Sequence, residues 1–188
     1  MVSDLLKRFS EALRELLCGF PEKIPPVLIA QHIPGGFSTA LAMRFNEMFP
    51  FAVKESKHGE MIESNTVYIS PGGKLMSVQQ MSLGKIMIHV SEDTENKYLH
   101  KPSVDHLFLS VAKENLRNVI AVVLTGMGKD GAIGIKKLHE LGASTIAQSE
   151  NTCVVFGMPK AAIQTGCIDH VVDLQSIAQK ISDLSFKK

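Results

Sequence analysis

The sequence predicts an α/β fold in which a mostly parallel sheet is flanked by helices and carries one antiparallel hairpin. Short apolar runs alternate with stretches of helical spacing in the second half, and two alternating segments flank a Ser82-Leu83-Gly84 turn. Strands that alternate with helices favour a parallel sheet covered on both faces. The length of 188 residues suits one domain, so we expect residues 1–188 to form a single domain.

In the first half, each element is predicted from its spacing of apolar residues. Apolar residues on one stripe, with charges between them, indicate a helix with one buried face at the N-terminus. A continuous apolar run after Pro25-Pro26 is typical of a strand buried on both faces. The expected elements are a helix at 3–18, a strand at 27–30, a helix from Gly36 to Phe49, strands at 51–54 and 66–69, and a hairpin of 75–78 with 85–89.

In the second half, helices and strands alternate regularly. Ser103 is the expected N-cap of the first of these helices, and Gly142 is expected to end the next one. The expected elements are a helix at 103–115, a strand at 119–124, a helix at 133–141, a strand at 144–147, a helix at 159–164, a strand at 170–173 and a helix at 176–184.

Composition excludes several classes of protein. A hydrophobic content of 45% argues against disorder, and a net charge of +1 does not indicate a nucleic-acid surface. No apolar run approaches the length of about 20 residues that a membrane helix needs, so membrane insertion is not expected. Charges interrupt the apolar N-terminus, which argues against a signal peptide. Three cysteines without CxxC spacing predict reduced thiols in a cytoplasmic protein.

Two predicted strands end in polar residues that precede glycine-rich turns. The first reaches Gln31 and His32 before residues 33–36, and the second reaches Thr125 before residues 126–131. Ligands bind outside the carboxyl ends of the strands in open parallel sheets, so both places are candidate site positions. There His32 is either a general base, since imidazoles exchange protons near neutral pH, or a structural histidine of a turn.

The second turn leaves similar alternatives open. Asp130 is either the N-cap of the next helix or the carboxylate that orients His32 and stabilises its imidazolium form. The Gly126-Met127-Gly128 backbone is either a tight structural turn or a site for an oxyanion or anion. A third interpretation is a phosphate- or nucleotide-binding turn, but the Lys-Ser/Thr pair that closes a P-loop is missing.

The remaining histidines do not predict a metal site. They are scattered and lack the HxH or HExxH spacing of metal-binding segments. They are His58, His89, His100, His106, His139 and His170. We therefore expect no metal and no cofactor.

Five segments in order resemble the catalytic domain of the chemotaxis protein-glutamate methylesterases, the CheB family. The similarity extends from Ser10 to Leu184, nearly the whole chain. The matching segments are Ile29–Phe37, Val67–Gly72, Lys101–Asp105, Leu124–Gly131 and Cys153–Pro159.

This resemblance implies a three-layer α/β sandwich with a serine–histidine–aspartate triad. It assigns the triad histidine to His32, the triad aspartate to Asp130 and an oxyanion-binding backbone N–H to Met127. The implied reaction is hydrolysis of glutamyl methyl esters on the cytoplasmic helices of methylated chemoreceptors, with deamidation of glutamines in some members. The implied location is the cytoplasm, and the receiver domain of full-length members has no counterpart in these residues.

One departure from the family concerns the nucleophile. The family serine lies in a Gly-x-Ser-Thr-Gly-Gly turn, and counting back from His32 without gaps places it on Leu6, so residues 1–9 depart from the family. Leucine has no nucleophilic atom, and no glycine turn presents the nearby Ser3 or Ser10. Two hypotheses stay open: a methylesterase whose N-terminus is not the native one, and an inactive relative that binds a receptor or another protein.

The departure also has a structural consequence. The serine strand lies inside the sheet of the family, so a helix at its place leaves neighbouring strands with unpaired edges. We expect poor stability, a rearranged edge, or pairing with a second chain.

Overall fold

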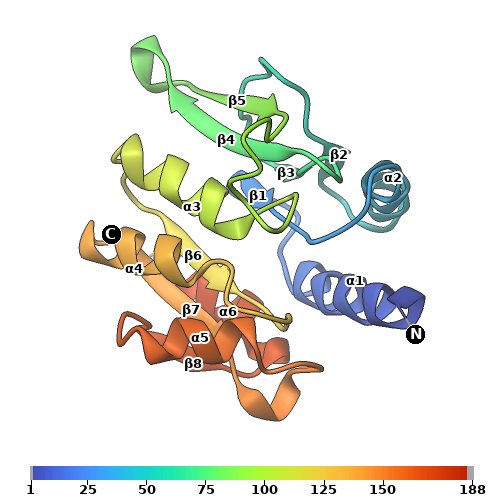
Figure 1. Cartoon of the computed structure of the whole chain (residues 1–188), viewed down its shortest axis with the longest axis vertical. Helices are drawn as coiled ribbons and strands as arrows, with labels where there is room; N and C mark the ends of the chain where they lie inside the picture. The colour runs from blue at the N-terminus through green and yellow to red at the C-terminus, as the bar shows by residue number, and fades with distance from the viewer. Residues whose placement is uncertain (1, 186–188) are drawn as a thin grey trace. The chain divides into compact units, whose positions relative to one another are not determined.

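The computed structural model describes the backbone of residues 2–185 and the side chains of residues 8–185. The chain forms two compact units. The central unit is Pro21–Glu114, and the terminal unit combines the residues up to Phe20 with those from Asn115 onward. Figure 1 labels the helices and strands of both units. None of the helices in the described chain has the length and apolar character needed to cross a bilayer.

The central unit contains a parallel sheet of three strands. β3 (Thr66–Ile69) lies between β1 (Val27–Ile29) and β2 (Ala52–Glu55), and all four of its residues are buried. β1 is an edge strand of this sheet, in which Ile29 is buried whereas Val27 and Leu28 are half-buried. The expectation that this strand is buried on both faces is therefore wrong for two of its residues.

The predicted antiparallel hairpin is present in the same unit. β4 (Leu75–Gln80) pairs with β5 (Ile86–Ser91) through a turn at Ser82–Gly84, and α3 (Val104–Lys113) packs against β4 (Figure 1). Ser103 is the N-cap of α3 as predicted, since its side chain accepts a backbone N–H bond. The remaining helix of this unit, α2 (Phe37–Met48), packs against β2.

The terminal unit contains a second parallel sheet. β7 (Ser144–Gln148) lies between β6 (Ile120–Val123) and β8 (His170–Val172). α4 (Ala132–Glu140) connects β6 to β7, and α5 (Met158–Gln164) connects β7 to β8. Because all three strands are parallel, their carboxyl ends lie on the same side of the sheet, and the segments that follow β6, β7 and β8 begin there.

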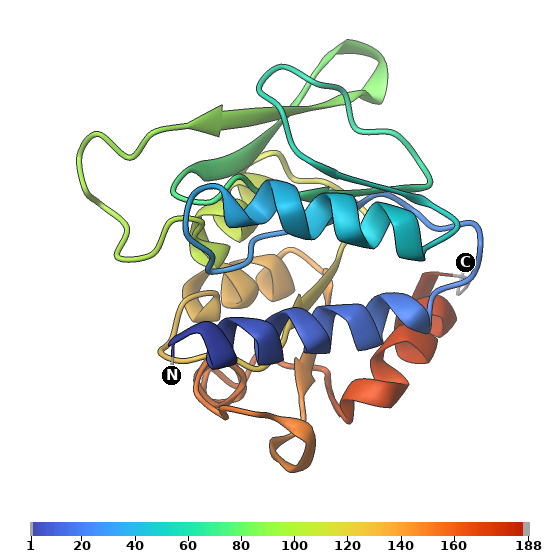
Figure 2. The ribbon, with the colours of Figure 1, turned by 90° about the vertical axis from the view of Figure 1, so that its right-hand side faces the viewer.

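Two further helices complete the terminal unit. α1 (Val2–Cys18) packs against α6 (Leu174–Ser185), which contacts β7, and Figure 2 shows the C-terminal end of α1 meeting α6. Their buried core joins Ala12, Leu16, Ile146, Leu174, Ile177 and Ala178. The predicted fold class, with parallel sheets flanked by helices and one antiparallel hairpin, is confirmed.

Candidate functional site

His32 lies just beyond β1, at the carboxyl end of a parallel strand. The strand ends at Ile29, and the residues up to Gly36 lead into α2. His32 is half-buried at this place. Its position between a strand end and a helix start is the one that the sequence predicts, and its role as a base stays a prediction.

The loop that carries His32 is held against the loop that follows β3. A Cβ on Gly72 would lie 2.2 Å from the Pro34 carbonyl oxygen, so only glycine permits this approach. The Gly72 N–H donates to Ser38 Oγ over 2.8 Å, and the Ser38 hydroxyl donates to the Glu55 carboxylate. Since Ser38 is fully buried, these bonds are shielded from water. The ends of β2 and β3 thus fix the backbone around His32.

A second histidine contacts His32. The rings of His32 and His100 stack with their centroids 4.3 Å apart and their planes 21° from parallel. His100 belongs to the loop between β5 and α3. From the sequence it was one of several scattered histidines. The signal that could have singled it out is its place directly before Lys101, where a family-like segment begins.

In the terminal unit, buried polar groups fix the start of the turn that follows β6. The Thr125 N–H donates to Gln148 Oε1 over 2.8 Å, and Thr125 Oγ1 donates to the Val155 carbonyl over 3.1 Å. Gln148 is fully buried, and its Nε2 donates to the Thr152 carbonyl over 2.8 Å. Sequence reasoning missed Gln148, because its partner Thr125 lies 23 residues away.

A close backbone approach fixes the next residues of this turn. A Cβ on Gly157 would lie 2.6 Å from the Gly126 carbonyl oxygen and 3.2 Å from Met127 Cα, so glycine is required there. The same carbonyl accepts hydrogen bonds from the N–H groups of Gly157, over 3.1 Å, and Met158, over 2.8 Å. The backbone around Met127 is therefore positioned before any substrate arrives.

Met127 and Asp130 share this turn, as the sequence predicts. The Met127 side chain is 68% exposed, and within residues 2–185 no hydrogen bond engages its backbone N–H. Gly131, with φ 94°, occupies the N-cap position of α4. The alternative that Asp130 is itself the N-cap residue is therefore wrong, because Gly131 takes that position. Asp130 is half-buried one residue before the cap, and its role toward His32 stays a prediction.

The position assigned to the family serine lies in a helix. Residue 6 falls within α1, which is continuous from Val2 to Cys18 and also contains Ser3 and Ser10. A nucleophile elbow is a sharp turn between a strand and a helix. The backbone at residue 6 does not form such a turn.

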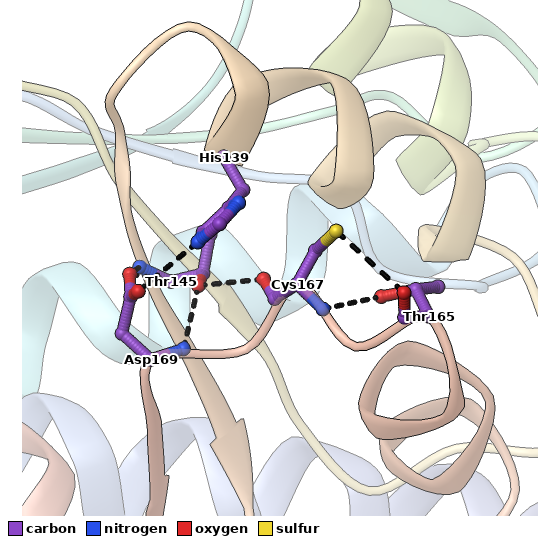
Figure 3. A network of polar contacts seen from close by, with 5 residues as sticks. All are labelled: His139, Thr145, Thr165, Cys167 and Asp169. Carbon is purple, nitrogen blue, oxygen red and sulfur yellow. Dashed lines mark hydrogen bonds and ion pairs between the residues drawn. The ribbon is translucent and has the colours of Figure 1, made fainter.

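A separate polar network lies at the amino ends of β7 and β8 (Figure 3). Asp169 Oδ2 accepts hydrogen bonds from the Thr145 N–H, over 2.8 Å, and hydroxyl, over 3.0 Å, and its Oδ1 lies 3.2 Å from His139 Nε2. Burial opposes ionisation of this carboxyl, but the Thr145 bonds and nearby His139 outweigh it and lower the pKa of Asp169. Because it joins the strand ends opposite the Thr125 turn, we interpret this network as structural.

Comparison with known proteins identifies the family. The family model for CheB methylesterase matches residues 10–181. The chain belongs to the CheB methylesterase family. The crystal structure of the Thermotoga maritima CheB methylesterase catalytic domain is similar to this chain with a TM-score of 0.87 and 35% identity, covering 93% of this chain and 92% of that one.

Curated CheB relatives carry a more detailed name. This chain is 42% identical over 171 residues to the protein-glutamate methylesterase/protein-glutamine glutaminase of Desulfitobacterium hafniense, covering 90% of this chain and 43% of that protein. It is 43% identical over 173 residues to the protein of the same name from Salmonella typhi, covering 92% and 49%. The chain thus spans about half the length of these CheB relatives.

Proposed function

We propose that this chain carries a protein-glutamate methylesterase site that acts on glutamyl methyl esters of chemoreceptor helices, with glutamine deamidation as a related reaction. Its family and the names of its relatives support this assignment. The observation that carries the proposal is that both motif segments follow the carboxyl ends of parallel strands, Gln31-His32 after β1 and Gly126–Asp130 after β6.

In the proposed reaction, His32 removes the proton of an attacking oxygen and returns it to the departing methanol. Asp130 orients the imidazole and stabilises its charged form, and the Met127 N–H binds the oxyanion of the tetrahedral intermediate. The contacts of Gly157 and Gln148 support the oxyanion role, because they fix the turn before substrate binds. A fixed donor needs no reorganisation when charge develops.

Residue 6, the position assigned to the family serine, does not supply the nucleophile. Leu6 lies in α1 and has no nucleophilic atom, so we propose that water is the attacking group in this chain. Removing the serine of a serine hydrolase lowers kcat by about 10⁶-fold, yet the oxyanion hole and substrate binding alone retain about 10³–10⁴-fold catalysis over water.

Release of methanol from a methylated chemoreceptor fragment tests the proposal. Because His32 is the proposed base for water, we expect a slow rate that falls by about 10²-fold or more in His32→Ala, toward the level that the oxyanion donor and binding supply, and that also falls in Asp130→Asn. His89→Ala is the matched control, because among the described residues that ring contacts Gln79 in the β4–β5 hairpin and His58. Equal rates for the parent chain and His32→Ala would refute the role of His32 as the base, and a parent rate equal to that of buffer would refute the esterase assignment.

The second function that a specific observation favours is binding without turnover. The helix at residue 6 favours it, since the family elbow is a turn rather than a helix. In that case titration calorimetry would detect binding of the receptor fragment, while methanol release would equal that of buffer. Phosphate or nucleotide binding has no comparable support.

A further inference from the structure

His100 is the described residue whose ring stacks on His32. Their ring centroids are 4.3 Å apart and the planes are inclined by 21°, so the contact is face to face. Both residues belong to the central unit, and both are half-buried. His32 comes from the end of β1 and His100 from the loop before α3, so the contact joins two segments distant in sequence.

The loop that presents His100 is organised by a carboxylate. Asp93 accepts hydrogen bonds from the N–H groups of Lys97, over 3.0 Å, and Tyr98, over 2.9 Å, and its Oδ2 lies 3.4 Å from Lys101 Nζ. Its side chain is only 4% exposed. The Tyr98 bond, aided by Lys97 and Lys101, lowers the pKa of Asp93, so the carboxylate that orders the loop is ionised at neutral pH.

Further contacts fix the residues on both sides of His100. The Gly73 N–H donates to the Lys101 carbonyl over 3.0 Å, and the Tyr98 ring contacts the His106 ring edge to face at 4.9 Å. Leu99 itself is 92% exposed, so apolar burial does not hold this part of the loop. Polar and ring contacts of the residues on both sides of His100 in sequence therefore hold the backbone that carries it.

Face-to-face stacking restricts rotation of an imidazole and leaves the edge of the ring accessible. The two ring nitrogens lie in the plane of the ring, and their hydrogen bonds leave from its edge. A second flat ring against the face therefore restricts rotation of the imidazole without occupying either nitrogen. We propose that His100 is a positioning residue that holds the His32 imidazole in one orientation by stacking on its face. This inference rests on the proposed role of His32 as general base.

Nuclear magnetic resonance of histidine-labelled protein tests the stacking directly. The His32 signals are assigned from their loss in His32→Gln. In the parent chain we expect nuclear Overhauser contacts between the two rings, and one sharp set of Nδ1 and Nε2 signals from His32. In His100→Ala we expect the ring-current shift of His32 to disappear and its ring signals to broaden, because the imidazole then samples several orientations. His100→Phe, which keeps a flat ring, is expected to restore the parent pattern.

Two comparisons separate positioning from a general structural effect. His89→Ala removes another ring of the same unit and is expected to leave the His32 signals unchanged. Asp93→Ala is expected to move the His32 signals toward those of His100→Ala, with the amide spectrum of β3 retained. His32 signals that are the same in the parent and in His100→Ala, or the same in His100→Ala and His100→Phe, would overturn the inference.

These measurements need no turnover, so this inference and the proposed function fail separately. A chain that releases no methanol but shows the expected His32 signals would refute the esterase and support the positioning. If the chain turns over, His100→Ala should lower kcat by about 10²-fold with little change in KM, as for a misplaced catalytic group. His100→Phe should recover most of that loss. An unchanged kcat in His100→Ala would overturn the positioning role.

Discussion

Replacing Gly72 by alanine tests whether close backbone contact fixes the loop that carries His32. The new Cβ would lie 2.2 Å from the Pro34 carbonyl oxygen and 2.8 Å from that of Ile33. Ordinary contacts begin near 3.4 Å, so the two loops must separate by about 1.2 Å. Since the obstructing atoms belong to the backbone, no flexible side chain can yield. Overpacking of this kind should lower the free energy of unfolding by about 1–3 kcal/mol.

Gly35→Ala is the matched control for this substitution. Its Cβ would lie 3.4 Å from the Gly72 carbonyl oxygen, which is an ordinary contact, so its stability should stay within about 1 kcal/mol of the parent. Urea unfolding followed by circular dichroism measures both variants. A displacement near 1 Å should also lower any His32-dependent methanol release by about 10²-fold. If Gly72→Ala proves as stable and as active as Gly35→Ala, the contact between the loops does not position His32.

Three further predictions concern the terminal unit. Gln148→Leu leaves the Thr125 N–H without its acceptor and should lower the free energy of unfolding by about 1–3 kcal/mol; an unchanged urea midpoint would contradict the role of Gln148 in fixing the turn. Above the ordinary pKa of 3.8, the parent should have a higher free energy of unfolding than Asp169→Asn. This difference should disappear as pH falls through the lowered pKa of Asp169. A difference that does not change with pH would refute this prediction. Burial raises the pKa of the Cys153 thiol to about 11, so at pH 8 iodoacetamide should alkylate the exposed Cys18 well before Cys153, as peptide mass spectrometry can check.

The positions of helices and strands could be predicted from apolar spacing, but their ends could not. The hairpin shows the reason. The sequence predicts that its first strand ends at residue 78, whereas β4 continues through Gln79 and Gln80, which pair with Met87 and Ile86. Backbone hydrogen bonds extend the ladder over these exposed glutamines. Hydropathy carries no information about such pairing.

The candidate site could be predicted where one local rule applied. The rule that ligands bind at the carboxyl ends of parallel strands led to His32 and to the turn of Met127 and Asp130. The residues that support them could not be found in this way, because Ser38 meets its partner Gly72 across 34 residues of sequence. The N-cap prediction for Asp130 failed because the next residue, a glycine with φ 94°, takes the cap position itself.

The helix α1 bears on the proposed chemistry, because residue 6 takes the place assigned to the family serine. An elbow presents its serine on a strained turn, whereas residue 6 lies in a regular helix, so a serine placed there would still lack the presentation that the reaction needs. A base and an oxyanion donor can still assist an attacking water when that serine is absent, since one removes its proton and the other binds the oxyanion. A methanol-release rate above that in buffer, with a part that is lost in His32→Ala, would therefore mark an esterase site without its serine. A rate equal to that in buffer, with receptor binding intact, would mark a binding module.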